Sequence, residues 1–107
     1  MPWDVKEDRI LARFRAALSE VYGDRLERVV LYGSRARRDH RPDSDYDIAV
    51  FIQDRGPLGH ELKRLAALET DILWDTGAVI SALPFPAGAY REQSGFMHEL
   101  RRDGLDL

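Results

Sequence analysis

The stretch LYGSRARRDHRPDSDYDIAVF, residues 31–51, decides the fold. It begins inside an apolar run that starts at Val29, and its last residues belong to a second apolar run, residues 48–52. Short apolar runs bounded by turn residues are typical of buried strands. Between the two runs lie a Gly-Ser turn, an arginine-rich segment and two aspartates separated by one residue. The stretch therefore predicts two strands that are antiparallel or mixed neighbours in one sheet, joined by a polar loop.

The two aspartates, Asp45 and Asp47, lie at the start of the second predicted strand. Side chains of a strand alternate between its faces, so both carboxylates are expected on the same side. Two like charges so close together repel each other unless a cation lies between them. Mg²⁺ prefers oxygen ligands and often takes one or two protein carboxylates together with substrate phosphates. Asp45 and Asp47 are therefore the predicted metal ligands and catalytic residues.

The turn before them, Gly33-Ser34, has the composition of a phosphate-binding turn. Gly33 has no side chain to block an approaching phosphate, and the hydroxyl and N–H of Ser34 can bond a β- or γ-phosphate. Four arginines lie between Gly33 and Asp43, and two of them, Arg37 and also Arg35, are expected to neutralise triphosphate charge. The alternative is a solvated loop kept soluble by its arginines. The flanking Gly-Ser and Asp-x-Asp favour phosphate binding.

The spacing of these residues resembles the nucleotidyltransferase signature, in which Gly-Ser is followed after ten residues by Asp-x-Asp. Here the two parts are Gly33-Ser34 and Asp45-Tyr46-Asp47. The wider string GSRAR…SDYDIAV is similar to the minimal nucleotidyltransferase (MNT) family, whose members are small single domains. The resemblance implies a polymerase-β-like nucleotidyltransferase fold of the α/β class, with a small mixed β-sheet and flanking helices. It also implies Mg²⁺ as the cofactor and ATP as a substrate.

Two features depart from that family. Arg38 stands where the family often has glycine. Many nucleotidyltransferases also carry a third carboxylate on the third strand, whereas that strand here reads AVISALPF, with Ser81 near the expected position. Asp71 and Asp75 lie just before this strand, and one alternative is that either of them completes the site. The better interpretation is that both are solvated residues at the end of a helix. The missing acid leaves two outcomes open: a catalyst with weakened metal binding, or a protein that only binds nucleotide.

Length and composition limit the class of protein. The chain has 107 residues, a formal net charge of −3 and no cysteine, so we expect one domain, residues 1–107, without disulfides or thiolate metal sites. No apolar run approaches the ~20 residues that span a bilayer, and the charged N-terminal segment is unlike a signal peptide. We therefore expect a soluble, cytoplasmic protein with no membrane contact. The acidic balance argues against direct nucleic-acid binding.

The remaining pattern predicts the order helix, strand, strand, helix, strand, helix. The expected helices cover residues 4–22, capped by Asp4, residues 58 to 74 or 75, and residues 90–102, with a short helix starting at Ser34. The expected strands cover residues 26–32, 47–52 and 78–83, and the prolines at 84 and 86 put the far end of the third strand at an edge or outside the sheet. Trp3 and Trp74 are expected in the core or at a partner contact.

The resemblance also implies a biological setting. Minimal nucleotidyltransferases commonly pair with a small helical HEPN protein, often a ribonuclease toxin, and act as its antitoxin by transferring AMP from ATP to a tyrosine of the toxin. The leading hypothesis is thus a Mg²⁺- and ATP-dependent protein adenylyltransferase in a complex with a HEPN-type partner. The alternative is a catalytically weak or inactive nucleotide-binding antitoxin that neutralises its partner by binding. Adenylylation of a small molecule ranks last, because the chain has no additional helical domain for such an acceptor.

Overall fold

One mixed sheet organises the computed structural model, which describes residues 4–107. Its strands are β1 (Leu26–Tyr32), β2 (Tyr46–Ile52), β3 (Ile80–Pro86) and β4 (Leu105–Asp106). Their order in the sheet is β3-β2-β1-β4. Strand β1 pairs antiparallel with both β2 and β4, whereas β2 and β3 are parallel. The predicted pairing of the first two strands and the mixed α/β class are confirmed.

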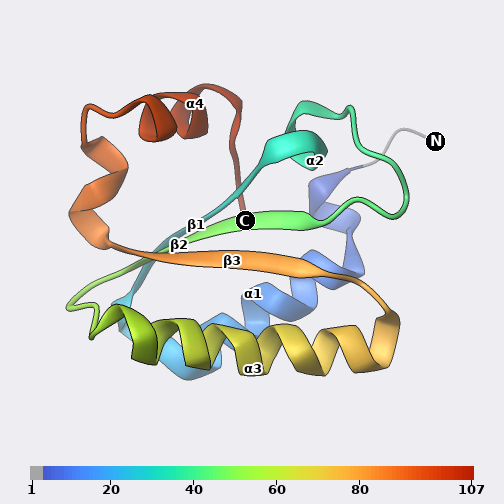
Figure 1. Cartoon of the computed structure of the whole chain (residues 1–107), viewed down its shortest axis with the longest axis horizontal. Helices are drawn as coiled ribbons and strands as arrows, with labels where there is room; N and C mark the ends of the chain where they lie inside the picture. The colour runs from blue at the N-terminus through green and yellow to red at the C-terminus, as the bar shows by residue number, and fades with distance from the viewer. Residues whose placement is uncertain (1–3) are drawn as a thin grey trace.

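Helices cover both faces of this sheet (Figure 1). The α-helices are α1 (Arg9–Tyr22), α2 (Gly33–Arg37), α3 (Leu58–Thr76) and α4 (Gly95–Asp103), and three short 3₁₀ turns are η1 (Val5–Glu7), η2 (Gly23–Arg25) and η3 (Ala87–Arg91). Helices α1 and α3 lie along one face, and α4 and η3 lie on the other. Helix α2 follows β1 directly, at the end of the sheet where β2 and β3 begin.

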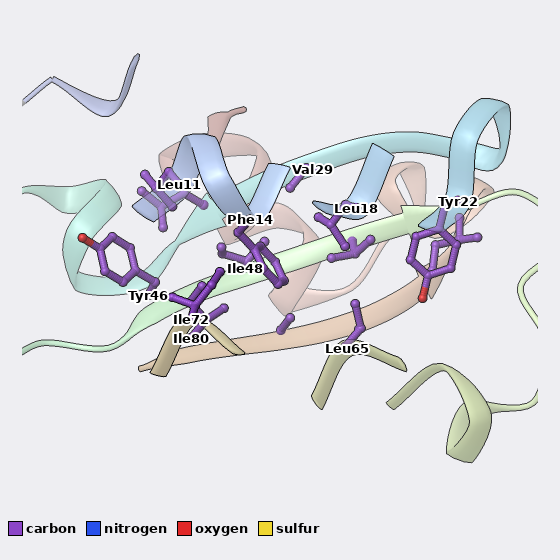
Figure 2. Close-up of a cluster of buried hydrophobic side chains, with 14 of the residues drawn as sticks. Leu11, Phe14, Leu18, Tyr22, Val29, Tyr46, Ile48, Leu65, Ile72 and Ile80 are labelled. Atoms are coloured by element: carbon purple, nitrogen blue, oxygen red, sulfur yellow. The ribbon is translucent and has the colours of Figure 1, made fainter. Parts of the chain in front are cut away.

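The strand alternation divides the buried residues between the two faces. Even-numbered residues of β2, such as Ile48, pack with α1 and α3 in the larger core, together with Phe14 and Leu65. Ala49 and Phe51 point the other way and pack with Met97 of α4 in a smaller core. Figure 2 shows the larger core, which extends beneath the sheet from Tyr46 at one end to Tyr22 at the other. Asp47 shares the parity of Ala49, so it belongs to the face that carries α4, and Asp45 lies just before the strand.

The first helix begins later than predicted. The sequence pattern indicated a helix from residue 4, but η1 ends before Asp8, and α1 begins at Arg9. The reason is that an Asp8 carboxylate oxygen accepts hydrogen bonds from the backbone N–H groups of Ile10 and Leu11 at 2.9 and 3.1 Å. Aspartate at an N-cap satisfies amide donors that the helix itself leaves without partners. Gly23 ends α1 as predicted, with φ 54°.

The C-terminal third also differs from the prediction in detail. The single helix expected over residues 90–102 is divided into η3 and α4, because Ser94 caps a new helix: its Oγ accepts a hydrogen bond from the backbone N–H of Met97 at 3.1 Å. Strand β3 begins and ends later than the predicted residues 78–83. It includes Pro84 and Pro86, which are tolerated because β3 is an edge strand. The last residues form β4, a strand that the sequence pattern did not indicate.

Two further expectations concern the tryptophans and the membrane. Trp74 is 84% exposed on α3, so it is not a core residue. Its expected role as a partner contact stays a prediction, and Trp3 lies outside the described residues. Among residues 4–107, none of the helices is long and apolar enough to cross a membrane.

Candidate active site

The candidate site lies where β1 ends and β2 and β3 begin. In the register of the sheet, Tyr32 of β1 is opposite Asp47 of β2, and Asp47 is opposite Ser81 of β3. Residues opposite each other in neighbouring strands project to the same face. Tyr32, Asp47 and Ser81 therefore form a row across the sheet, on the face that carries α4. This row is the floor of the candidate site.

Gly33 begins α2 beside this row, and the Asp47 carboxylate lies against it. A Cβ atom on Gly33 would collide with Oδ2 of Asp47. Gly33 also has φ 75°, a left-handed conformation that residues with a side chain rarely adopt. Glycine is thus required here twice, for the turn and for the space that the carboxylate occupies. The Gly-Ser and Asp-x-Asp parts of the pattern meet in the folded chain.

The two aspartates interact electrostatically. Burial raises the pKa of Asp47, the negative charge of Asp45 raises it further, and Arg37 opposes the shift. The pKa of Tyr32 is raised by burial and by the charge of Asp47. Two neighbouring carboxylates that repel each other are a donor set that suits a hard divalent cation. Asp45 and Asp47 would hold such an ion, with substrate oxygens completing its coordination.

The other predicted site residues are not all in one place. Arg37 is exposed at the end of α2, within 3.3 Å of Asp39 and near enough to Asp47 to lower its pKa. Ser34 follows Gly33 in the first turn of α2, where its carbonyl accepts the N–H of Asp39 at 3.0 Å. The structure thus brings Gly33, Ser34 and Arg37 together with the aspartates.

Arg35 is placed differently. Its side chain is buried, with 6% exposure, and its guanidinium donates hydrogen bonds to the carbonyls of Pro42 and Ser44. Arg35 and Arg37 are two residues apart on a helix, about 200° around its axis, so they point in nearly opposite directions. The expected role of Arg35 in neutralising a triphosphate is therefore replaced by a contact with the protein's own loop.

The third-strand position is occupied by Ser81, and the acids considered as substitutes lie elsewhere. Asp71 and Asp75 are exposed residues of α3, which covers the opposite face of the sheet. Asp75 pairs there with Arg13 at 2.6 Å. Within residues 4–107, no group of three or more His, Cys, Asp or Glu side chains is arranged to hold a metal ion. Of the acids considered from the sequence, Asp45 and Asp47 are therefore the ones that lie at the site.

Sequence reasoning missed the contribution of α4. A cavity of about 220 Å³ beside Gly33 and Arg37 is also lined by Phe96, Glu99 and Asp103 of α4. The Phe96 ring meets the Tyr32 ring edge-on, with centroids 5.3 Å apart. No local sequence signal marks these α4 residues, because they reach the site only through the packing of α4 on β1 and α2.

The backbone of Arg38 has a conformation typical of the glycine that the family often has at this position. It caps α2 with φ 62° and ψ 26°, the left-handed conformation that glycine adopts most readily. The loop therefore keeps a glycine-like backbone although its residue has a side chain. Left-handed geometry costs a non-glycine residue roughly 1–2 kcal/mol.

The electrostatics of Asp47 give a first testable prediction. The pKa of Asp47 is higher in the folded state than in the unfolded state, so its ionised form destabilises the fold. This destabilisation is fully present at pH values above the raised pKa. The penalty is lost as the pH falls through the raised pKa to the ordinary value. Asp47→Asn should therefore be more stable than the wild type at pH 7. The gain in the free energy of unfolding should be no more than ~1 kcal/mol, a rise in Tm of about 4 °C, because the group is partly solvated.

Thermal unfolding of both proteins, followed by circular dichroism in the absence of divalent metal, measures this difference. The difference should shrink as the pH is lowered stepwise below 5. A lower Tm for Asp47→Asn at pH 7 would show that the carboxylate stabilises the fold and would contradict the assigned electrostatics.

Comparison with known proteins defines the class. Residues 18–81 match the family described as polymerase beta, nucleotidyltransferase. The match covers more than half of the chain, which therefore belongs to this nucleotidyltransferase family. A 54-residue segment is 33% identical to MJ0141 of Methanocaldococcus jannaschii, which is named as a candidate protein adenylyltransferase. The match covers 50% of this chain, and the chain spans about half, 54%, of that relative.

Solved structures agree on the fold. A toxin-antitoxin crystal structure with AMP-PNP superposes with a TM-score of 0.59 at 17% identity, covering 87% of this chain and 68% of that one. A mutant of the toxin-antitoxin MntA-HpeT gives 0.58 at 15% identity, covering 86% and 68%. A candidate nucleotidyltransferase from Sulfolobus solfataricus gives 0.60 at 15% identity, covering 98% and 87%. The predicted nucleotidyltransferase family is confirmed by the family match, and the predicted polymerase-β-like fold agrees with these structures.

Proposed function

We propose that this protein is a Mg²⁺-dependent adenylyltransferase that transfers AMP from ATP to a tyrosine of a HEPN-type toxin, and that it acts as the cytoplasmic antitoxin of that partner. One observation carries the proposal: the Asp47 carboxylate lies against the Gly33 backbone, and Asp45 is close enough for its negative charge to raise the pKa of Asp47. Family membership supports nucleotidyl transfer. The adenylyltransferase name of MJ0141 and the toxin-antitoxin structures of similar fold support the acceptor class.

In the proposed reaction, the tyrosine oxygen attacks the α-phosphorus of ATP. A new bond forms between this oxygen and phosphorus, the bond to the bridging oxygen breaks, pyrophosphate leaves, and the tyrosine proton passes to solvent. Divalent metal, when bound, supplies charge stabilisation at the attacking and leaving oxygens. Asp45 and Asp47 hold the cation, and Arg37 faces the triphosphate charge. Ser34 and the Gly33 backbone receive phosphate oxygens.

An acceptor can approach the candidate site across the face of the sheet that carries Asp47 and Ser81. The face that carries Asp47 and Ser81 is covered by α4 and η3 only in part, and Ser81, Leu83 and Phe96 are exposed on it. A folded partner protein can reach the carboxylates from this side, which favours a macromolecular acceptor over a small one.

The test is an incubation of the purified protein with α-³²P-labelled ATP, Mg²⁺ or Mn²⁺, and the product of the neighbouring gene. We expect label on the partner, and mass spectrometry should find 329 Da, about one AMP, added to a tyrosine. A partner whose tyrosine is changed to phenylalanine should remain unlabelled. Absence of label under every divalent metal, with a stable complex of the two proteins, would overturn transfer.

The second candidate function is neutralisation by binding alone. The observation that favours it is Ser81, which stands opposite Asp47 where a third carboxylate would lie. In this case the nucleotide site is a remnant, and the partner is inhibited by occlusion. The two candidates differ in whether neutralisation needs Asp45 and Asp47.

The register of β3 gives a second testable prediction. Ser81→Asp places a third carboxylate in the row beside Asp47, about 5 Å away across the neighbouring strands. An additional hard oxygen ligand should tighten Mn²⁺ binding roughly tenfold, about 1.4 kcal/mol, as measured by titration with free Mn²⁺ followed by electron paramagnetic resonance.

The matched control is Ser94→Asp, because Ser94 is exposed and lines a hollow with Phe85 and Pro86, at the end of β3 opposite Ser81. It should leave Mn²⁺ affinity unchanged. Equal affinities for wild type and Ser81→Asp would show that the third-strand position does not face the metal.

A further inference from the structure

We propose that Arg35 is a positioning residue: it fixes the backbone on both sides of Asp45, so that the two carboxylates converge on one cation. The inference rests on the proposed function in one respect, because it takes Asp45 and Asp47 as metal ligands. It assigns Arg35 a task within the protein instead of a contact with nucleotide.

The first contact holds the peptide unit that leads into Asp45. The Arg35 Nε–H and one Nη2–H donate to the carbonyl of Ser44 at 3.1 and 2.8 Å, and Nη2 also donates to the carbonyl of Pro42 at 3.3 Å. The Ser44 carbonyl belongs to the peptide bond that joins Ser44 to Asp45. A planar guanidinium that donates two hydrogen bonds to this oxygen fixes its direction. The orientation of Asp45 follows, because its backbone begins at that peptide plane.

The second contact holds the residue after Asp45. The Arg35 guanidinium lies 3.8 Å from the centre of the Tyr46 ring, a cation–π distance. Tyr46 is itself held at three points: its ring is buried in the larger core (Figure 2), its hydroxyl donates to Asp8 at 2.9 Å, and its N–H donates to the Val79 carbonyl at 2.9 Å. Arg35 therefore rests on a fixed surface.

Asp45 itself is exposed and follows a loop, residues 38–44, whose first part is tied to α2 by the Asp39 N–H, which donates to the Ser34 carbonyl at 3.0 Å. Within that loop, Ser44 and Arg41 bond each other, through Ser44 N–H to the Arg41 carbonyl at 3.0 Å and Arg41 N–H to Ser44 Oγ at 2.8 Å. These bonds close the turn, whereas Arg35 ties the turn to the body of the protein. Without Arg35, Asp45 would sample several orientations, while Asp47, inside β2, would keep its place.

The test substitutes Arg35 with lysine, which keeps the positive charge but loses the fork and the flat stacking surface. Groups that orient metal ligands typically change metal affinity 10- to 100-fold when removed. We expect Arg35→Lys to weaken Mn²⁺ binding about tenfold, measured in the presence and absence of ATP by paramagnetic resonance of free Mn²⁺.

The chain offers a closely matched control. Arg28 also stacks on a tyrosine, with its guanidinium 4.0 Å from the centre of the Tyr90 ring, and it pairs with Asp106 at 2.9 Å. Arg28 lies near the start of β1, whereas Gly33 directly follows the end of that strand. Arg28→Lys should lower the Tm about as much as Arg35→Lys but leave Mn²⁺ affinity within twofold of wild type. Equal Mn²⁺ affinities for Arg35→Lys and Arg28→Lys would overturn the inference.

A measurement on the wild-type protein keeps the inference testable if Arg35→Lys does not fold. In ¹H–¹⁵N spectra, the Nε–H of Arg35 should exchange slowly with water and keep its shift when Mg²⁺ and ATP are added, whereas the Nε–H of Arg37 should move. A larger change at Arg35 than at Arg37 would overturn the positioning role. Failure of the proposed function has a different signature, since wild type itself would then bind no Mn²⁺ with or without ATP.

Discussion

Replacing both Asp45 and Asp47 with asparagine is expected to lower AMP transfer to the partner at least ~1,000-fold while leaving the complex with the partner intact. The carboxylates are the charged groups that hold the cation, and metal charge stabilises the transition state of phosphoryl transfer by several kcal/mol. A loss of ~4 kcal/mol corresponds to about 10³-fold in rate. Transfer is measured with labelled ATP, and complex formation by size-exclusion chromatography.

Asp43→Asn is the matched control, because Asp43 is an exposed aspartate in the same loop, two residues before Asp45. It should keep transfer within a few-fold of wild type. The double variant also separates the two candidate functions in cells: if neutralisation depends on transfer, the variant no longer protects against the toxin. Protection that persists after transfer is abolished would establish neutralisation by binding, and undiminished transfer would show that these carboxylates do not hold the metal.

Gly33→Ala is expected to lower transfer at least ~100-fold while destabilising the fold no more than Gly77→Ala does. Gly33 and Gly77 have nearly the same positive φ, 75° and 78°, so an alanine should cost each about 1–2 kcal/mol of conformational strain. They differ in their surroundings. A Cβ at Gly33 meets the Asp47 carboxylate, whereas a Cβ at Gly77 meets nothing within 4 Å.

The collision at Gly33 involves the end of a side chain, so the Asp47 carboxylate can turn away instead of unfolding the protein. Its displacement by about 1 Å is enough to cost ~10²-fold in catalysis. Urea unfolding compares the two stabilities, and labelled-ATP transfer compares the two activities. Equal transfer by Gly33→Ala and Gly77→Ala would show that contact between the glycine and the carboxylate has no part in the reaction.

Local pattern predicted much of the candidate site. The two-residue period of a strand predicts a shared face for Asp45 and Asp47 without knowledge of the rest of the chain, and the structure begins β2 at Tyr46, between them. The requirement for glycine at position 33 was likewise expected from the turn, although the expected reason was room for a phosphate. The structure adds a second reason, the room that the Asp47 side chain occupies.

The arginines show where local pattern stops. Arg35 and Arg37 have the same chemistry and lie in the same five-residue helix, and helical geometry separates their directions without saying which one faces the site. That choice depends on Tyr46 and the Ser44 carbonyl, which the fold brings to Arg35. A similar limit applies to Asp8, whose cap moved the start of α1 from the predicted residue 4.

The sequence by itself determined the family, the two-strand frame and the two carboxylates, because these depend on spacing within one short stretch. Only the tertiary structure decided that Ser81 stands opposite Asp47, that Asp71 and Asp75 lie on the far face, and that α4 borders the site. These relations depend on the register and packing of elements far apart in the chain. The register and packing are set by the need to bury both faces of β2, and no local sequence pattern specifies them.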